Sequence, residues 1–498
     1  MHSVDWLVLA AYTALLVGIA WRASRGQEGA ESHLRANRSL PAWAVVFSIL
    51  ATEISAATYI GVPERGYVGN WNYLQFAIGN LIGKVVLATF LIGLYWKLNL
   101  ETAYGFLGQR LGPRAQRASA WAFLAGRLIA SGVRMYIAAI AFSVVTETNT
   151  IAAIAAIALL STLYTLLGGL KAIVWTDVAQ GMTFLVGAAA ALAFGLWHTE
   201  VPLEQAWSEV LGAAKTRVIQ LDLGGKPWYA ELNSLPMAVL GGMTLVLATH
   251  GTDQMMVQHL LNTRSQKGAT RSLVTAGLFT FPVVILFLSV GTMLWLYHRH
   301  ATVAAYDPSD TNRIFPNFIM HVIPTGLRGL VFAGLFAAAI ASLGATINAA
   351  TATWVNDVRP SANAAPSSMS RVRSLGLVFG VLLAGIAVFF ARYNADGSKQ
   401  LVDTALQAMT IVYGGILGAF ACALVPGRRF ADGAVVAGLL AGIACGALLF
   451  FQTELQTWLK LGGPAKLAWP LSIPISLCVT MGVAALLSIG HTRKSVAA

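Results

Sequence analysis

The sequence predicts an all-α membrane protein with about 13 transmembrane helices. Of its 498 residues, 57% are apolar and only 11% are charged, whereas a soluble domain carries about 25% charged residues. Apolar runs recur along the whole chain between Val4 and Ile489, and most of them approach the roughly 20 residues that a helix needs to cross a bilayer. We therefore expect an integral, multi-pass protein whose main partner is the lipid bilayer.

Charged, proline-rich and glycine-rich stretches separate the apolar runs and set the boundaries of the expected helices. The first run is followed, not preceded, by basic residues (Arg22 and Arg25), which is the reverse of a cleavable signal peptide and indicates a retained first helix. In chain order the expected spans lie near residues 4–22, 42–68, 73–96, 118–145, 149–168, 175–198, 236–261, 270–298, 327–355, 374–392, 401–425, 432–452 and 469–490.

The distribution of lysine and arginine predicts the orientation of the chain. An odd number of spans puts the two termini on opposite sides of the membrane. With the N-terminus outside, the expected cytoplasmic segments hold 19 of the 33 basic residues and the external segments hold 11, in agreement with the positive-inside rule. We expect a bacterial-type inner (plasma) membrane with the C-terminus in the cytoplasm.

Several classes of function are excluded. The net charge of +12 comes from short loops between apolar runs, so it reflects membrane topology and not nucleic-acid binding. The longest connection covers roughly 199–235, which leaves no room for a separate soluble module. No nucleophile with an adjacent base and no cluster with metal-ligand spacing is found, so we expect no enzyme, and we infer no obligate protein partner.

Two of the expected spans are irregular. The span 42–68 carries Thr52, Glu53 and Thr58 at its middle and then Pro63, which removes a helical N–H group. We expect this span to be discontinuous, with its backbone opened around 54–63. The span 236–261 carries the run Thr-His-Gly-Thr-Asp-Gln at 249–254. These two spans begin two consecutive blocks of five helices, and interrupted helices at matching positions of two halves point to an inverted-repeat transporter with its site at the breaks.

The chain resembles the sodium/solute symporters related to the sodium/glucose and sodium/proline carriers, over about residues 4 to 450. The resemblance rests on Ala-Thr-Glu-Ile-Ser-Ala-Ala-Thr-Tyr-Ile-Gly (51–61), the highly specific Gly-Gly-Leu-Lys-Ala-Ile-Val-Trp-Thr-Asp (168–177), Gly-Thr-Asp-Gln (251–254), the stretch from 331 to 353 and Gly-Gly-Ile-Leu-Gly-Ala-Phe (414–420). It implies one transporter domain with a 5+5 inverted-repeat (LeuT-like) core and discontinuous helices. Its expected parts are a leading helix (4–22), two repeats (42–198 and 236–425) and two trailing helices (432–490).

The resemblance also implies a sodium site between the second and ninth spans. Sodium needs a cage of oxygen atoms, which an unwound helix supplies as carbonyls and a neighbouring helix as hydroxyls. The implied ligands are Ala51, Ile54, Ala338, Ala341 and Ser342. Where this family usually has two adjacent hydroxyl residues, the chain has Ala341 and Ser342, so one ligand is missing unless Thr346 or a water replaces it. Alternatively, Ser342 is a small residue that allows close helix packing.

Some members of this family have a second sodium site, built from the aspartate of the Trp-Thr-Asp run and hydroxyls one turn further along the ninth span. Asp177 is present here, but the hydroxyl positions are Gly344 and Ala345, so we expect no working second site. Two roles stay open for Asp177: it guides the departing ion along its path to the cytoplasm, or it caps the start of the sixth span beside Thr176.

Glu53 is the most unusual residue, because a carboxylate at the middle of a span is costly without a partner or a role. Two roles stay open: Glu53 pairs with Lys84, Arg127 or Arg134, or it binds the solute or takes up a proton. The resemblance places the solute beside the unwound part of the second span. The expected wall positions are Thr58, Asn72, Gln75, Val246, Thr249 and Gln407, with Glu53 as a further contact. Val246 and His250 differ from the polar or aromatic positions of sugar carriers, so no sugar is inferred.

Together these features predict a sodium-coupled secondary active symporter that imports a small polar organic solute by alternating access, with Na⁺ as the coupling ion. Two alternatives stay open. A proton taken up by Glu53 replaces sodium, which the missing hydroxyl at Ala341 favours. The second alternative is a membrane solute sensor on the same scaffold, which needs an output module that the chain does not display.

Overall fold

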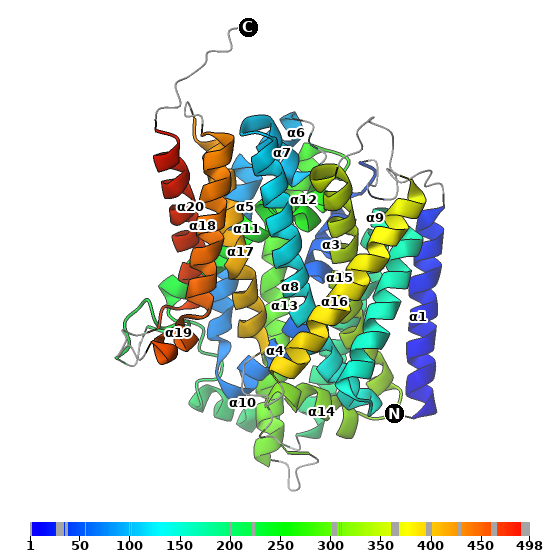
Figure 1. Ribbon diagram of the computed structural model, residues 1–498. Helices are drawn as coiled ribbons and strands as arrows, with labels where there is room; N and C mark the ends of the chain where they lie inside the picture. Colours follow the sequence, from blue (N-terminus) through cyan, green and yellow to red (C-terminus); the bar gives the residue numbers. More distant parts are fainter. Residues whose placement is uncertain are drawn as a thin grey trace.

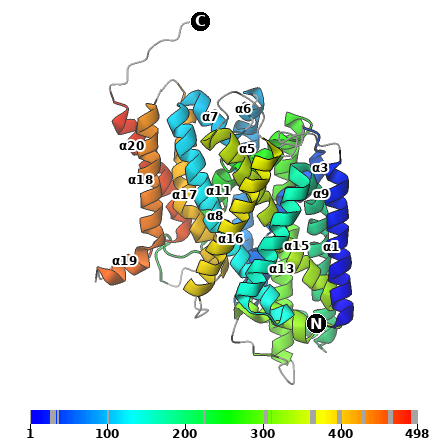
Figure 2. The same cartoon turned by 45° about the vertical axis from the view of Figure 1, so that its right-hand side comes forward.

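The computed structural model describes residues 2–25, 34, 38–54, 56–98, 100, 102–199, 201–221, 225–300, 306–307, 309, 311–359, 368–394, 401–426, 430–459 and 466–489. Within these ranges the protein is a bundle of long helices that run between two faces (Figures 1 and 2). The described residues form no β-strand, and a single parallel bridge joins Leu40 to Thr263.

The helices follow one another with short connections. In chain order they are α1 (Ser3–Ser24), α3 (Ala42–Glu53), α4 (Ala56–Val68), α5 (Leu74–Phe90), α6 (Ile92–Lys97), α7 (Ala103–Arg110), α8 (Pro113–Thr146), α9 (Thr150–His198), α10 (Leu203–Gly212), α11 (Leu235–Gly251), α12 (Gln254–Leu261), α13 (Gln266–His300), α14 (Ile314–His321), α15 (Leu327–Thr353), α16 (Met369–Tyr393), α17 (Leu401–Leu424), α18 (Asp432–Phe450), α19 (Gln452–Trp458) and α20 (Ser472–Leu487), with short 3₁₀ turns at Trp71–Tyr73, Thr311–Arg313 and Trp469–Leu471 and a π-helical turn at Trp354–Val358.

The predicted multi-pass membrane protein is confirmed. Nine helices among the described residues are long and apolar enough to cross a bilayer, and two further pairs of bent helices bring this number to eleven. The two remaining expected spans lie on shorter apolar stretches, 150–163 of α9 and 409–424 of α17. The count of thirteen and the boundaries of the two repeats therefore stay predictions.

The fifth and sixth expected spans meet at a kink inside α9, and residues 170–174, which were expected to connect the two spans, are helical. Gly169 alone leaves helical geometry, with φ 60° and ψ −171°, a conformation that glycine adopts at little steric cost. As a result Asp177 lies inside a helix and not at the start of one, so the capping role that was left open for it is wrong.

The two irregular spans are broken, as predicted. α3 and the following helical residues 58–68 meet at a bend of 62°, and α11 meets α12 at 65°. The first break lies at the start of the stretch expected to open, 54–63: α3 ends at Glu53, and Pro63 lies inside α4. A proline is tolerated within such a helix because neighbouring helices compensate for the freed backbone groups.

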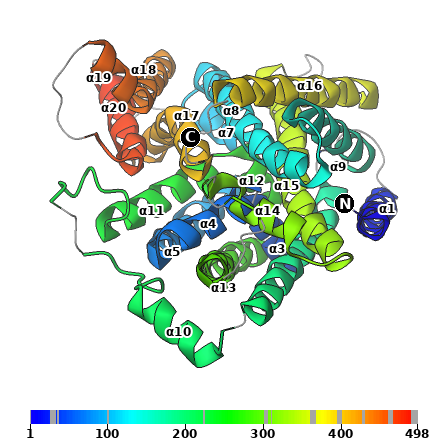
Figure 3. The same ribbon diagram turned by 90° about the horizontal axis from the view of Figure 1, so that it is seen from below.

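The broken helices lie in the centre of the bundle. α1 flanks it on one side, and α18 and α20 flank it on the other (Figures 1 and 2). Viewed from below, α3, α4 and α12 are surrounded by α5, α8, α13 and α15 (Figure 3). The start of α1, together with α10, α14 and α19, lies at the lower face in Figure 1, opposite α7, so segments expected to share one side of the membrane do lie together.

Small residues let α5 and α11 approach each other closely. A Cβ atom on Gly79 would lie 2.1 Å from the carbonyl oxygen of Val239, and one on Gly242 would lie 2.2 Å from that of Phe76. These separations are far shorter than a van der Waals contact, so the two backbones touch only because both positions lack a side chain. This contact holds α5 against the half-helix α11.

Substituting Gly79 by valine should therefore separate the two helices and destabilise the protein. We expect a cost of about 1–3 kcal/mol from overpacking, seen as a lower melting temperature of the purified protein in detergent. Gly385→Val is the matched control, because a Cβ atom at Gly385 of α16 meets nothing within 4 Å. Equal melting temperatures for the two variants would contradict this interpretation.

Candidate functional site

A cavity lies at the two helix breaks. It encloses about 1000 Å³ of empty space, including the part that is open to solvent, and its wall comes from α3, α4, the start of α5, α8, α11, α12, α13 and α17. The lining residues are Thr52, Glu53, Ile54, Thr58, Tyr73, Phe76, Ala77, Asn80, Arg127, Arg134, Leu245, Val246, Thr249, His250, Met256, Thr280, Val283, Val284 and Met409. Its mixture of apolar surface and a few polar groups is typical of small-molecule sites.

Four of the expected solute contacts line this cavity: Glu53, Thr58, Val246 and Thr249. The hydroxyl of Thr249 donates to the carbonyl of Leu245 at 2.8 Å and lies 3.0 Å from Nδ1 of His250. The second contact orients the imidazole ring, so Thr249 supports the wall of the cavity as well as facing it.

The other three expected contacts lie outside the cavity. Asn72 donates to Oε1 of Gln220 at 2.9 Å, and Gln75 donates to the carbonyl of Asn233 at 3.0 Å. Both amides thus bind the long connection 199–235. Gln407 lines a separate pocket beside Trp469. The structure does not bring these three residues to the breaks: Asn72 and Gln75 are held by the connection, and Gln407 faces the other pocket.

The connection 199–235 is fixed to the end of α4 by Lys215. Its ammonium group donates to the carbonyls of Tyr67 at 2.7 Å and Gly69 at 3.0 Å. Burial lowers the pKa of Lys215 to about 8, because a charged amine loses hydration when it is enclosed. The connection therefore covers this end of the bundle beside the cavity.

Glu53 forms an ion pair at the end of α3. Each of its carboxylate oxygens lies 2.8 Å from Nζ of Lys84 on α5, and Oε1 lies 2.7 Å from Nε2 of His250 on α11. Lys84 is fully buried, whereas the carboxylate keeps 15% of its surface exposed. Of the partners considered for Glu53, the structure selects Lys84, and it adds His250. This pairing favours a fixed charge over a free proton carrier.

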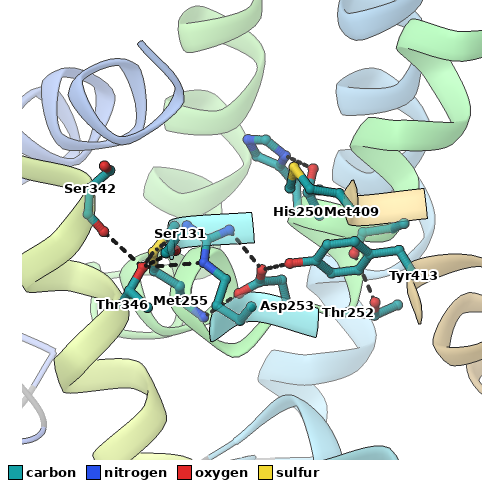
Figure 4. A network of polar contacts seen from close by, with 12 residues as sticks. Ser131, His250, Thr252, Asp253, Met255, Ser342, Thr346, Met409 and Tyr413 are labelled. Carbon is teal, nitrogen blue, oxygen red and sulfur yellow. Dashed lines mark hydrogen bonds and ion pairs between the residues drawn. The ribbon is translucent and has the colours of Figure 1, made fainter. Parts of the chain in front are cut away.

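A second ion pair lies at the break between α11 and α12. Asp253 caps α12 by accepting from the backbone N–H of Met255 at 2.8 Å, and its other oxygen accepts from Nη1 of Arg127 at 3.1 Å. The hydroxyl of Tyr413 on α17 donates to the same carboxylate (Figure 4). Asp253 and Arg127 are almost completely buried, so three helices are joined through one carboxylate.

The network continues to α15. Thr346 donates to the carbonyl of Ser342 at 2.8 Å, lies 2.9 Å from the hydroxyl of Ser131 and accepts from Nε of Arg127 at 3.3 Å (Figure 4). With these contacts Thr346 is committed to the network around Arg127. It is therefore a poor substitute for the hydroxyl that is missing at Ala341.

Arg134, two turns after Arg127 on α8, differs from Arg127. Its side chain is partly exposed and lines the cavity, and its one hydrogen-bond contact among the described residues is at 3.6 Å to the sulfur of Met409. The described residues place no carboxylate within ion-pair distance of it. Arg134 thus presents a guanidinium group to the cavity without a protein counter-charge.

The expected sodium ligands lie where α3 packs against α15. Ala51 and Ile54 are in and just after the last turn of α3, where carbonyls lack helical partners. Ser342 is buried on α15, and Ala338 and Ala341 lie on the same helix, with side chains outside the described part of the chain. Carbonyls from a helix end and a hydroxyl from a neighbouring helix fit a small hard cation.

Asp177 lies next to the same half-helix. It is fully buried on α9, and Oδ2 accepts from the hydroxyl of Ser48 on α3 at 2.5 Å. Oδ1 has no hydrogen-bond partner within the described ranges. A buried carboxylate with one unsatisfied oxygen is suited to receive a cation.

Some of the lining residues were not expected from the sequence. Tyr73 and Phe76 stack with ring centroids 5.7 Å apart, and Met256 and Met409 complete the apolar part of the wall. The spacing of one helical turn between the two aromatic residues was visible in the sequence, but aromatic residues at this spacing are common in membrane helices.

The comparisons with known proteins agree with this architecture. The model of the sodium:solute symporter family matches residues 33–442. The chain belongs to this family. It is accordingly a sodium-coupled symporter of a small solute, and Na⁺ is its coupling ion.

The similarity to known transporters extends over most of this chain. It is 24% identical to the sodium/sialic acid symporter NanT of Aliivibrio fischeri, over 89% of this chain and 86% of that protein. It is 24% identical to the human sodium/iodide cotransporter (92% and 68%) and 26% identical to the human sodium-coupled monocarboxylate transporter 1 (88% and 72%).

Solved structures confirm the fold. A substrate-bound, outward-open Na⁺-coupled sialic acid symporter superimposes with a TM-score of 0.84 over 98% of both chains, at 20% identity. A nucleobase-cation-symport-1 family transporter in a closed conformation gives 0.52, with 91% of this chain and 93% of that chain covered, at 13% identity. At such identities the likeness concerns the arrangement of helices, which is the inverted-repeat transporter fold expected from the sequence.

The buried Asp253–Arg127 pair should contribute strongly to stability. Asp253→Asn leaves a buried guanidinium without its counter-charge, and we expect a loss of about 3–5 kcal/mol. Combining it with Arg127→Met should cost clearly less than the two single changes together. Thermal unfolding of the purified variants measures this. Arg134→Met is the matched control, and we expect its loss of stability to add to that of Asp253→Asn. If the loss caused by Arg127→Met also added fully to that of Asp253→Asn, the interpretation would be contradicted.

Proposed function

We propose that the cavity at the helix breaks is the solute site and that the solute carries a negatively charged group, such as a carboxylate, which Arg134 binds. The observation that carries this proposal is the pairing of the charges around the cavity. Glu53 is paired with Lys84, and Arg127 is paired with Asp253. The guanidinium of Arg134 is left for a ligand, and a planar guanidinium suits a carboxylate well.

Related proteins support an anionic solute. Iodide and monocarboxylates, named for two human relatives, are anions, and sialic acid, named for the bacterial relative, is an acid. The remaining wall fits an organic body: Tyr73, Phe76 and Met409 supply apolar surface, and Thr58 and Thr249 supply hydroxyls. Asn72, Gln75 and Gln407 are proposed to contact the solute in another conformation of the cycle.

The proposed sodium site consists of the carbonyls of Ala51 and Ile54 and of Ser342, Ala338 and Ala341 on α15. The buried Asp177, with its free oxygen beside α3, is proposed to receive the ion on its way to the cytoplasm. At a membrane potential of 100 mV one inward charge supplies about 2.3 kcal/mol. This free energy corresponds to roughly fiftyfold accumulation of a neutral solute. The accumulation of an anion is lower, because the same potential opposes the entry of its negative charge.

The proposed orientation places the start of α1, α10, α14 and α19 outside and the C-terminus in the cytoplasm of a bacterial-type inner membrane. The cavity then lies on the external side, beside the start of α5. On its cytoplasmic side, the network of Asp253, Arg127 and Tyr413 joins α12, α8 and α17. Import by alternating access requires this network to open, with repeats 42–198 and 236–425 moving against each other.

The solute assignment is tested by uptake into reconstituted vesicles with an inward sodium gradient, using a panel of labelled solutes matched for size and differing in charge. We expect anions to be accumulated and neutral analogues to be excluded. Arg134→Gln should lower uptake of the anion at least tenfold, since a hydrogen bond to a charged group contributes about 1.5–3 kcal/mol, and Arg134→Lys should restore part of it. Accumulation of neutral solutes only, or unchanged uptake by Arg134→Gln, would overturn the proposal.

The sodium site is tested by changing its hydroxyls. Ser342→Ala removes the hydroxyl on α15 and should weaken sodium binding about tenfold or more. Ala341→Ser adds the hydroxyl that the family usually has and should strengthen it. Sodium-dependent quenching of tryptophan fluorescence in the purified protein, with choline as the balancing cation, gives both affinities. Thr351→Ala, two turns further along α15, is the control and should leave them unchanged.

A further inference from the structure

The ends of two half-helices meet behind the cavity. α3 ends at Glu53, and α11 ends at Gly251, directly after His250. The C-terminal turn of a helix carries partial negative charge, because its last carbonyls point outward without helical partners. The carbonyl of Gly251 accepts from the hydroxyl of Tyr95, so the negative charge of this region comes mainly from the end of α3 and the carboxylate of Glu53. Helix ends of this kind hold the coupling cations of transporters with broken helices.

In this protein a side chain already supplies a cation there. The ammonium group of Lys84 lies 2.8 Å from both carboxylate oxygens of Glu53. Lys84 is completely buried. Glu53 and His250 line the cavity, whereas Lys84 does not, so the ammonium approaches from the side of α5, away from the solute site.

The surrounding helices make room for this side chain. A Cβ atom at Gly277 on α13 would lie 3.1 Å from Cδ of Lys84, so a glycine at that position lets the lysine stem pass. His250 lies on the other side of the carboxylate, with Nε2 at 2.7 Å from Oε1. Its Nδ1 lies 3.0 Å from the hydroxyl of Thr249. Helix residues on three sides thus hold the ion pair in one geometry.

Stability alone does not account for this pair. Removing two charges from water costs several kcal/mol each, and a well-packed apolar pair is often equally stable or more so. A buried lysine in the membrane is correspondingly rare without a function. The sequence nevertheless places an acid at the end of α3 and a base opposite it. The carboxylate forms one side of a cation site, and the ammonium group of the lysine is the cation in it.

We infer that the ammonium group of Lys84 is a resident cation that occupies the place of a second coupling ion between the ends of α3 and α11. The protein therefore binds a single sodium ion, at the site between α3 and α15, and this inference rests on that proposed sodium site. Removal of the ammonium would leave the carboxylate of Glu53 facing two helix ends. That arrangement would bind a metal cation such as sodium.

The experiment counts sodium ions on the purified, full-length protein with ²²Na⁺ alone, at constant ionic strength with choline. Wild type should bind one sodium, which Ser342→Ala weakens. Lys84→Met, which keeps an unbranched apolar stem and removes the ammonium group, should bind two. Lys84→Met combined with Glu53→Gln should return to one, because the carboxylate that holds the new ion is gone.

Three results would overturn the inference. Two ions on the wild type would show that the ammonium replaces nothing. A single ion on folded Lys84→Met would show that the region is no cation site. Loss of the single sodium in Glu53→Gln would make Glu53 a ligand of the transported ion, and this variant decides the question if Lys84→Met does not fold. Failure of the sodium site itself is distinguishable, because the wild type would then bind no sodium or Ser342→Ala would bind it unchanged.

Discussion

Backbone carbonyl and amide groups cannot be left unpaired inside a bilayer, so an interrupted helix needs partners for the groups at its break. At the end of α11, the hydroxyl of Tyr95 donates to the carbonyl of Gly251 at 2.6 Å. Asp253 then caps the start of α12 at 2.8 Å. At the end of α3, the carbonyls of Ala51 and Ile54 belong to the proposed sodium site, where a bound cation would take the role that these side chains have at the other break.

The charges at the breaks follow from this. Each break carries a carboxylate, and each carboxylate has a basic partner from a neighbouring helix: Lys84 for Glu53 and Arg127 for Asp253. These pairs have different positions relative to the cavity. Glu53 faces it, while Asp253 is closed off between α8, α12 and α17. One pair therefore adjusts the electrostatics of the binding region, and the other joins helices that have to separate during transport.

Much of the fold was predictable because hydropathy, proline and glycine act locally. The broken spans were found from polar residues in apolar runs, at Thr52 and Glu53 and at 249–254. Within the stretch expected to open, 54–63, the break lies at the first residues, and Pro63 lies inside α4, where α13 packs closely against it: a Cβ atom at Gly291 would lie 2.0 Å from the carbonyl of Pro63. The kink in α9 likewise depends on Gly169 adopting φ 60° and ψ −171°, a conformation that glycine permits but does not require.

The candidate site was less predictable, because it depends on which partners the fold brings together. Lys84 was one of three bases that were considered for Glu53, and nothing local distinguishes it from Arg127 or Arg134 on α8. The choice arises in three dimensions: Arg127 lies beside Asp253, which the sequence analysis passed over as part of a polar run, and Arg134 lies two turns away, on the cavity wall. Once Asp253 has paired with Arg127 and Lys84 with Glu53, the cavity keeps one cationic group. The proposed selectivity for an anion is then a consequence of how the helix breaks are neutralised.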